Sequence, residues 1–177
     1  DLGGDSWDFA TVWGRTDSIN DGYTFLLWQA ADADADGVDN NIEDAAQNNG
    51  DANDDGIPDA AQENVASFVN TVSEEYSVLE VPAACVITSV NSQAESGNTV
   101  ADSGYDYPAG FLNFVIDCGT PGFVADIVVY NFGVANEDYS LKKYNPSNSS
   151  YTNITAVFTT DTIGGQSVVV ASYQVTD

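Results

Sequence analysis

The sequence predicts a mainly β protein, in which a β-sandwich domain follows an acidic loop segment and an N-terminal aromatic strand pair. Two observations favour this fold class. Residues 64–177 alternate runs rich in β-branched and aromatic residues with Gly, Pro, Asn and Asp clusters, at roughly the intervals of a sandwich. The chain also has 177 residues and 43% apolar content, which is enough for a buried core. We therefore divide the chain into residues 1–31, 32–63 and 64–177.

Residues 64–177 are expected to be all-β. Two of the runs, 111–117 and 125–130, are nearly continuously apolar, which is typical of central strands. Between them, Thr120-Pro121-Gly122 has the residues of a tight turn. The expected strands are residues 75–81, 85–90, 111–117, 123–130, 151–159 and 167–175.

Residues 1–31 form the predicted aromatic strand pair. Two apolar runs, 7–13 and 23–29, flank the turn-rich residues 16–22, which predicts a strand, a turn and a second strand. Two strands in water are only marginally stable, so their aromatic side chains must pack on something. The rest of this chain, an upstream part of a longer chain and a neighbouring molecule all remain open as that partner. The aromatic residues concerned are Trp7, Phe9, Trp13, Tyr23, Phe25 and Trp28.

The acidic segment, residues 32–63, contains the most specific pattern in the sequence. Aspartates or asparagines alternate up to a glycine twice, and the second run starts nineteen residues after the first. In an oxygen-lined Ca²⁺ loop, side chains at positions 1, 3, 5, 9 and 12 and the carbonyl at position 7 surround the ion, while glycine at position 6 permits a sharp turn. Counted from Asp32 and from Asp51, both runs match this spacing. The sequence therefore predicts two tandem calcium loops.

Each loop has a complete predicted ligand set, but the two sets differ in strength. For the first loop the ligands are Asp32, Asp34, Asp36, the carbonyl of Val38, Asn40 and Glu43. For the second loop they are Asp51, Asn53, Asp55, the carbonyl of Ile57, Asp59 and Gln62. Because Gln62 offers one neutral oxygen where the first loop has a carboxylate, we expect the second site to be weaker unless Glu63 or a neighbouring segment contributes. Short helical turns are expected at residues 43–47 and 59–65.

Two other interpretations of this segment are a solvated linker and a calcium sensor. Most acidic runs are solvated linkers, but the regular spacing favours a metal site. A sensor would open a pair of helices to expose an apolar groove, and the helical turns expected here are too short and too polar for that. The sequence instead favours a joint that calcium stiffens between two β modules.

The net charge of −25 comes from 28 acidic residues and only three basic ones, Arg15, Lys142 and Lys143. This charge repels itself and disfavours the compact state, so we expect the binding of divalent ions to be coupled to folding. Nucleic acid and anionic membrane surfaces are not expected as partners, because both are bound through basic patches. The sequence also lacks an apolar run long enough to span a membrane, so direct membrane insertion is not expected.

Cys85 and Cys118 are the only cysteines, 33 residues apart in two strand-like runs. In an oxidising compartment we expect a disulfide between them, which would stabilise the fold by about 3–4 kcal/mol through chain entropy. Two buried free thiols are the alternative. Zinc is not expected, because the chain has no histidine. With no initial methionine and no signal-peptide pattern, the chain is expected to be a processed piece of a larger protein, extracellular or on the cell surface.

Parts of the first two segments resemble repeats of bacterial cell-surface proteins. The phrases DADADGVDNNIE and DANDDGIPDAAQ resemble thrombospondin type 3-like repeats, although Asp39 stands where proline is common and Asn40 replaces the aspartate of position nine. The phrase VWGRTDSINDGYTFLLWQ is similar to the closing strand of GLUG repeats, with threonine in place of the usual proline. In large bacterial surface proteins such repeats build β-solenoid-like stems.

Residues 65–177 are similar to the choice-of-anchor β-domains that lie just before the sorting signal of such proteins. The phrases LEVPAACVITSV, YPAGFLNFVIDCGTPG and LKKYNPSNSSYTNIT carry this resemblance. These domains are defined by position and pattern rather than by activity. The resemblances therefore imply a bacterial surface location and leave the activity open.

The composition argues against an enzyme. Without histidine, neither a Ser-His-Asp nor a Cys-His nucleophile can be assembled. No carboxylate pair stands out from the predicted calcium ligands. Lys142 or Lys143 could supply the amine for an isopeptide bond to Asn or Asp, or the two could form a solvated cationic pair that relieves local negative charge.

Two non-enzymatic functions remain. The first is a calcium-stiffened structural module of an extracellular or cell-surface protein, which assembles into a filament or stalk when residues 1–31 complete the open sheet edge of a neighbouring copy. The second is an adhesive or carbohydrate-binding β-domain, with aromatic side chains at its tips such as Tyr105, Tyr107 and Tyr144. Tyrosines in loops can equally be packing corners.

Overall fold

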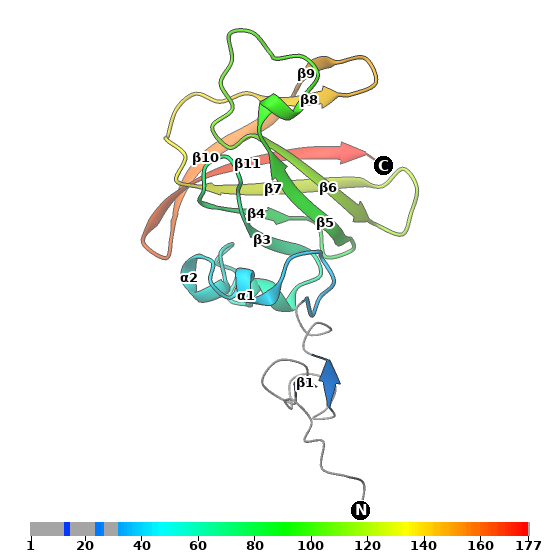
Figure 1. Cartoon of the computed structure of the whole chain (residues 1–177), viewed down its shortest axis with the longest axis vertical. Helices are drawn as coiled ribbons and strands as arrows, with labels where there is room; N and C mark the ends of the chain where they lie inside the picture. Colours follow the sequence, from blue (N-terminus) through cyan, green and yellow to red (C-terminus); the bar gives the residue numbers. More distant parts are fainter. Residues whose placement is uncertain (1–12, 15–23, 27–31, 177) are drawn as a thin grey trace, which may run out of the picture.

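The computed structural model of the protein describes residues 13–14, 24–26 and 32–176 (Figure 1). Over these residues the protein is mainly β with antiparallel sheets, as the sequence predicts. The largest sheet has five strands in the order β10-β11-β7-β4-β3. These strands are β3 (Val65–Val69), β4 (Tyr76–Glu80), β7 (Val124–Phe132), β10 (Ala156–Ile163) and β11 (Gln166–Thr176).

β11 is an interior strand of this sheet, because it pairs with β10 on one side and with β7 on the other. Its apolar run from Val168 to Ala171 is buried. Such a run is typical of a strand that is covered on both faces. The edges of the sheet are β10 and β3.

One face of the sheet is covered by the hairpin of β5 (Val86–Gln93) and β6 (Phe111–Asp117), which lies across it (Figure 1). Leu79 and Ile127 from the sheet pack with Ile87 of the hairpin in the first core, and all three are almost completely buried. The covering layer consists of two strands. The more specific prediction of a β-sandwich is therefore not confirmed by this arrangement.

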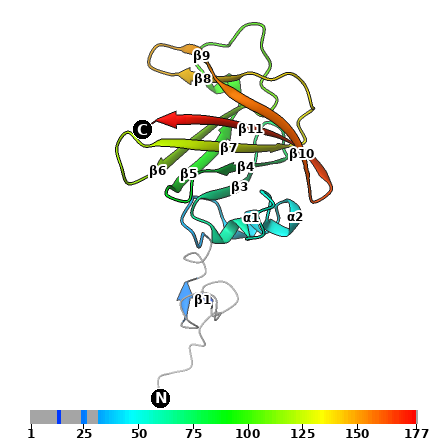
Figure 2. The same ribbon diagram turned by 180° about the vertical axis from the view of Figure 1, so that it is seen from behind.

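The acidic segment lies at the β3 edge of the sheet, with α1 (Asn40–Glu43) and α2 (Gln47–Gly50) next to β3 (Figure 1 and Figure 2), and part of it packs on the opposite face. Ala46 and Ala52 pack there against buried valines of β3, β4 and β11 in the second core. Val38 instead reaches the first core. The acidic segment is therefore part of both cores and does not simply run beside the sheet.

The helical turns of this segment differ from those expected. The side chain of Asp39 caps α1 by accepting a hydrogen bond from the N–H of Asn41 at 2.9 Å, so the helix ends at Glu43 instead of beginning there. After the second loop, the helical turn η3 (Asp59–Ala61) stops before Val65, which already belongs to β3.

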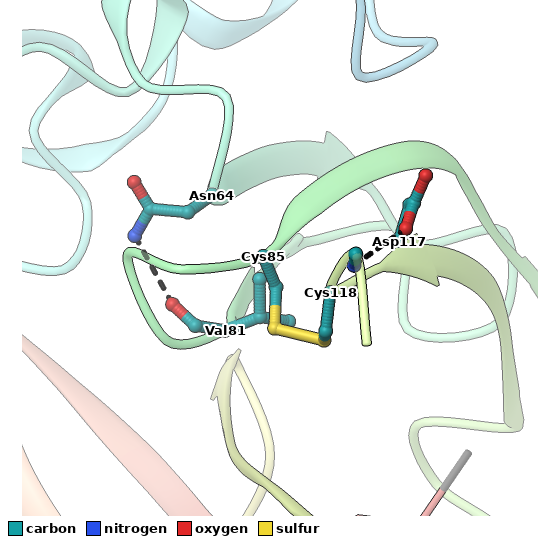
Figure 3. Close-up of a disulfide and its surroundings, with 6 residues drawn as sticks. Asn64, Val81, Cys85, Asp117 and Cys118 are labelled. Carbon is teal, nitrogen blue, oxygen red and sulfur yellow. Dashed lines mark hydrogen bonds between the residues drawn. A yellow bond between two sulfur atoms is a disulfide. The ribbon is translucent and has the colours of Figure 1, made fainter. Parts of the chain in front are cut away.

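The expected disulfide is present between Cys85 and Cys118 (Figure 3). Cys85 directly precedes β5 and Cys118 directly follows β6. The bond therefore continues the pairing of Val86 with Asp117 and closes the open end of the hairpin.

Next to the disulfide, hydrogen bonds fix the end of the acidic segment between the two layers. The carbonyl of Glu63 accepts from the N–H of Ile87 at 2.7 Å. The carbonyl of Asn64 accepts from the N–H of Val81 at 2.9 Å, and the Asn64 side chain donates to the Val81 carbonyl at 3.1 Å (Figure 3). These bonds hold the start of β3 against both β4 and β5.

Two further hairpins lie outside the ladder of the main sheet. β8 (Leu141–Asn145) pairs with β9 (Ser150–Ile154). Near the N-terminus, β1 (Trp13–Gly14) pairs antiparallel with β2 (Phe25–Leu26), so the described ends of the two predicted runs are paired strands, while the predicted turn at 16–22 lies outside the described residues. The other residues of the predicted strands 7–13 and 23–29, and the packing of their aromatic rings, lie outside the described residues. No described helix is long and apolar enough to cross a membrane.

Candidate metal centre

The two acidic loops have the same backbone conformation. At the fourth position, Ala35 and Asp54 have φ of 64° and 60°. At the sixth position, Gly37 and Gly56 have φ of 94° and 89°. Positive φ angles are uncommon for residues other than glycine. Their recurrence nineteen residues apart shows that the repeated sequence pattern folds into a repeated structure.

Three hydrogen bonds also recur at equivalent positions of the two loops. The glycine N–H donates to the carboxylate of position 1, at 3.0 Å in the first loop and 3.2 Å in the second. The next N–H donates to the carboxylate of position 5, at 2.7 Å and 2.8 Å. The N–H of position 2 donates to the side chain of position 9, from Ala33 to Asn40 at 2.7 Å and from Ala52 to Asp59 at 3.1 Å. These bonds orient the side chains of positions 1, 5 and 9 in both loops.

The first loop brings carboxylates together in a buried place. Asp32, Asp34 and Asp36 each offer an oxygen within 4.8 Å of those of the other two. Asp36 and Glu43 have an exposed fraction of 0%. Oδ2 of Asp36, Oε2 of Glu43 and both carboxylate oxygens of Asp34 have no hydrogen-bond partner among the described residues. A buried carboxylate without a partner is strongly unfavourable, and a divalent cation bound between these oxygens would remove that penalty.

Burial raises the pKa of these carboxyl groups. The pKa of Asp36 rises to about 7 because the side chain is desolvated, and the charges of Asp34 and Asp32 add to the effect. The pKa of Asp34 rises to about 6, mainly through burial, and the charge of Asp32 adds to the effect. The pKa of Glu43 rises to about 9, through burial and then through the charges of Asp36 and Asp34. A bound cation would offset the unfavourable free energy of ionising these buried carboxyl groups.

The second loop contributes Asp59, its ninth residue, to the same region. Asp59 has an exposed fraction of 0%, and burial raises its pKa to about 6. Its charge in turn raises the pKa of Asp36 and of Glu43. The sequence pattern places Asp59 in the second loop only, whereas the structure shows that its charge also acts on the first loop.

Ser67 of β3 is a residue of this region that the loop pattern does not reveal. It is completely buried, and its N–H donates to Oε1 of Glu43 at 3.3 Å. Its hydroxyl group lowers the pKa of the Asp59 carboxyl, against the larger effect of burial. Ser67 therefore connects the twelfth position of the first loop with the ninth position of the second. The only signal in the sequence is one serine inside the apolar run Val65–Val69.

The second loop is more exposed, and amide groups already occupy some of its acceptors. The side-chain amide of Gln62 donates to Oδ1 of Asp55 at 3.4 Å and to the carbonyl of Ile57 at 3.2 Å, two of the groups predicted to bind an ion. The amide of Asn48 donates to Oδ2 of Asp51 at 3.3 Å. Because an N–H donor competes with a cation for the same lone pairs, these amides would oppose the binding of an ion in the second loop.

The other predicted ligands have mixed surroundings. Val38 is buried in the first core, whereas Ile57 has an exposed fraction of 49%. Asn53 is buried and its oxygen accepts a long hydrogen bond of 3.4 Å from the N–H of Asp55. Asn40 and Asp59 each accept a hydrogen bond within their own loop, as described above.

All of these groups are oxygen donors. A carboxylate-rich oxygen set suits a hard cation with many ligands, which favours Ca²⁺ over zinc. No family model, no curated protein and no solved structure matches the chain. The metal assignment therefore depends on the repeated loop conformation and on the buried carboxylates of the first loop.

Proposed function

We propose that the acidic segment binds calcium and that the bound ion stiffens a structural module of an extracellular or cell-surface protein. One observation carries this proposal. Asp36 and Glu43 both have an exposed fraction of 0%, and each has an oxygen without a partner among the described residues, within a loop of calcium-binding spacing. Bound Ca²⁺ would neutralise this buried charge. We assign the tighter site to the first loop and the weaker site to the second.

The packing of the segment supports a stiffening role. Val38 lies in the first core, and Ala46 and Ala52 lie in the second. An ion held between Asp32 and Glu43 would bind together two stretches of backbone that pack on different layers. It would thereby fix the direction of the chain at residue 32, where the acidic segment begins.

The disulfide supports a location outside the cytoplasm. Cys85 and Cys118 are bonded, and disulfides persist mainly in oxidising compartments. The similarity of the sequence to repeats of bacterial surface proteins extends this proposal to the surface of a bacterial cell, with the main sheet and the β5–β6 hairpin as the two layers of a sandwich.

Self-assembly through residues 1–31 is the second part of the proposal. Within the described residues, β10 pairs with β11 on one side only. Its other edge offers backbone groups to an added strand, and Val157 on β10 has an exposed fraction of 64%. A strand from residues 1–31 of a neighbouring copy would complete that edge and extend the sheet from molecule to molecule.

An adhesive or carbohydrate-binding domain is the alternative. Tyr105 supports it, with an exposed fraction of 52%. However, the hydroxyl of Tyr107 donates to Asp102, and that of Tyr144 accepts from the N–H of Thr99. These internal bonds favour a packing role for the two tyrosines, and so favour the structural module. We propose no enzymatic activity.

Calorimetric titration and thermal unfolding test the calcium proposal. Ca²⁺ at about 100 times its Kd should stabilise the fold by about 2.7 kcal/mol, which raises Tm by roughly 5–10 °C for a chain of this size. Asp36→Asn should remove most of this gain. Asp44→Asn, an exposed neighbour outside the predicted ligand sets, should keep it. Equal Tm and equal resistance to proteolysis in Ca²⁺ and EDTA would refute the proposal.

Sedimentation velocity of the full chain tests the assembly proposal separately. We expect association that Val157→Lys on the edge strand weakens. Val115→Lys serves as the control, because Val115 is similarly exposed, at 58%, but lies on β6 away from that edge. A chain that stays monomeric at all concentrations would end the assembly proposal and leave the calcium proposal intact. A monomer that binds glycans would favour the adhesive alternative.

A further inference from the structure

Lys142 of β8 forms an ion pair with Asp102, forty residues earlier in the connection between β5 and β6. The pair is shielded from solvent, since the Lys142 side chain is 8% exposed and that of Asp102 is 17% exposed. The adjacent Lys143 is exposed and forms no ion pair with a described residue. Lys142 is thus held against one carboxyl group and largely shielded from solvent, whereas Lys143 is solvent-exposed.

Aromatic rings surround this pair. The Lys142 ammonium lies 3.0 Å from the centre of the Tyr105 ring. The Tyr107 hydroxyl donates to Oδ2 of Asp102 at 2.6 Å. The surrounding aromatic cluster consists of Tyr105, Tyr107, Phe111, Tyr144 and Tyr151, with neighbouring ring centroids as close as 4.5 Å. These rings limit the access of water, which weakens the solvation of both charges.

A covalent bond between Lys142 and Asp102 would attach the β8–β9 hairpin to the rest of the fold. The β8–β9 hairpin pairs with no other described strand. Side chains hold it to the connection: the Tyr151 hydroxyl donates to the Val100 carbonyl at 2.6 Å, and the Tyr144 hydroxyl accepts from the Thr99 N–H at 3.1 Å. The ion pair joins the same two segments.

We propose that Lys142 and Asp102 form an intramolecular isopeptide bond. The observations that carry this proposal are the contact between an amine and a single carboxyl group, their shielding by the aromatic cluster, and the hydroxyl of Tyr107 on the carboxyl oxygen. The bond would join the β8–β9 hairpin covalently to the connection that precedes β6. This proposal is independent of calcium binding.

The reaction needs no cofactor and no oxidant. The Lys142 ammonium passes one proton to Oδ1 of Asp102, and the neutral Nζ attacks Cγ of Asp102. The hydrogen bond from Tyr107 polarises Oδ2, which remains as the amide oxygen. The other oxygen takes a second proton from the nitrogen and leaves as water. One C–N bond forms and one C–O bond breaks, so an ammonium and a carboxylate become an amide and one water molecule.

Intact-mass measurement of the reduced full chain tests the proposal. The wild-type chain should be lighter than its sequence mass by one water molecule, and Lys143→Ala should show the same deficit relative to its own sequence. Lys142→Arg keeps the positive charge but cannot form this amide, and Asp102→Ala removes the carboxyl group. Both variants should have their full sequence mass, with circular dichroism showing that at least Lys142→Arg is folded.

Proteolytic mapping locates the bond. Trypsin cuts after a lysine only when its side-chain amine is free, so it should spare Lys142 and cut after Lys143. A second protease should release a branched peptide that contains both Lys142 and Asp102. A succinimide at an Asp-Gly step also loses one water but gives no branched peptide. A folded wild-type chain with its full sequence mass, or with a water deficit and no branched peptide, would overturn the proposal.

Discussion

The backbone N–H of Ser67 donates a hydrogen bond to Oε1 of Glu43 at 3.3 Å, which attaches the twelfth residue of the first acidic loop to the edge strand β3. Both residues have an exposed fraction of 0%. The other oxygen of Glu43, Oε2, has no partner among the described residues. The sheet therefore holds one oxygen of this carboxylate and leaves the second free for the proposed ion. Ion binding and the packing of the acidic segment on the sheet should consequently be coupled.

Glu43→Gln should separate these two effects. Loss of the anionic ligand should weaken calcium binding at the tighter site by about tenfold or more, which corresponds to at least ~1.4 kcal/mol. In EDTA the same variant should be more stable than the wild type at neutral pH, because glutamine is neutral without having to bind a proton on folding, as the buried Glu43 must. Titration calorimetry and Tm measurements in Ca²⁺ and EDTA check both. Glu63→Gln is the control, since Glu63 is exposed. A variant that binds calcium as tightly as the wild type would contradict the assignment of Glu43.

Gln62→Glu should strengthen the second site. It replaces an amide that donates to Asp55 and to the carbonyl of Ile57 with a carboxylate that can bind the ion through both oxygens. We expect the weaker calcium affinity to rise about tenfold, a gain of ~1.4 kcal/mol. Ala61→Glu adds the same charge at an exposed neighbouring position and should leave that affinity nearly unchanged. Equal gains from both variants would mean that long-range charge, and not ligand chemistry, sets the affinity.

Without divalent ions, stability should fall as pH rises. The pKa values of Asp34, Asp36, Glu43 and Asp59 in the folded protein are about 6, 7, 9 and 6, above ordinary values of 3.8 for Asp and 4.5 for Glu. The folded state therefore holds protons that the unfolded state releases. Its stability in EDTA should be fully present below about pH 4 and decline up to about pH 9.

Calcium should reverse this trend, because it displaces the same protons and binds more tightly as pH rises. Thermal unfolding across this pH range, with and without Ca²⁺, checks both parts. High salt serves as the control, since it screens the general repulsion of a chain with net charge −25 more than it changes buried groups. Stability in EDTA that increases with pH would contradict the burial of these carboxyl groups.

Gly37 and Gly56 form a matched pair that tests the packing of the first loop. Both have positive φ, at 94° and 89°, so alanine should cost about 1–2 kcal/mol at either position. A Cβ on Gly37 would also lie 3.3 Å from Cα of Ser89 on β5, whereas a Cβ on Gly56 would meet nothing within 4 Å. Urea unfolding should therefore show a larger loss for Gly37→Ala than for Gly56→Ala. Equal losses of unfolding free energy in the two variants would mean that the first loop is not closely packed against β5.

Much of the β structure could be predicted from local sequence. The expected strand at residues 111–117 coincides with β6, and those at 75–81, 85–90, 123–130 and 167–175 lie within three residues of β4, β5, β7 and β11 at each end. These runs are apolar or β-branched and are bounded by turn residues, so their own composition favours extended backbone.

The missed strands depend on partners rather than on composition. Val65–Val69 follows a loop whose twelfth ligand favours a helical turn, and it becomes β3 because β4 offers a complete ladder. Leu141–Asn145 contains two lysines, and it is a strand through its pairing with β9. The expected strand at 151–159 is divided between β9 and β10, which belong to different sheets.

In the candidate site, too, the local pattern could be predicted from the sequence and the tertiary contacts could not. The spacing of aspartates predicts two similar loops, and the repeated φ angles and hydrogen bonds agree with it. The sequence does not reveal Ser67, nor the effect of Asp59 on the first loop, because both depend on how the loops pack on β3. The disulfide prediction is confirmed, since Cys85 and Cys118 lie at adjacent ends of paired strands.

The position of β11 between β7 and β10 has a consequence for biosynthesis. β11 pairs with both β7 and β10, yet it is made after both of them. A nascent chain therefore cannot close the five-stranded sheet until the residues through Thr176 have emerged from the ribosome. Non-local pairings of this kind form late. We therefore expect β10 to join the main sheet only after the synthesis of β11 is complete.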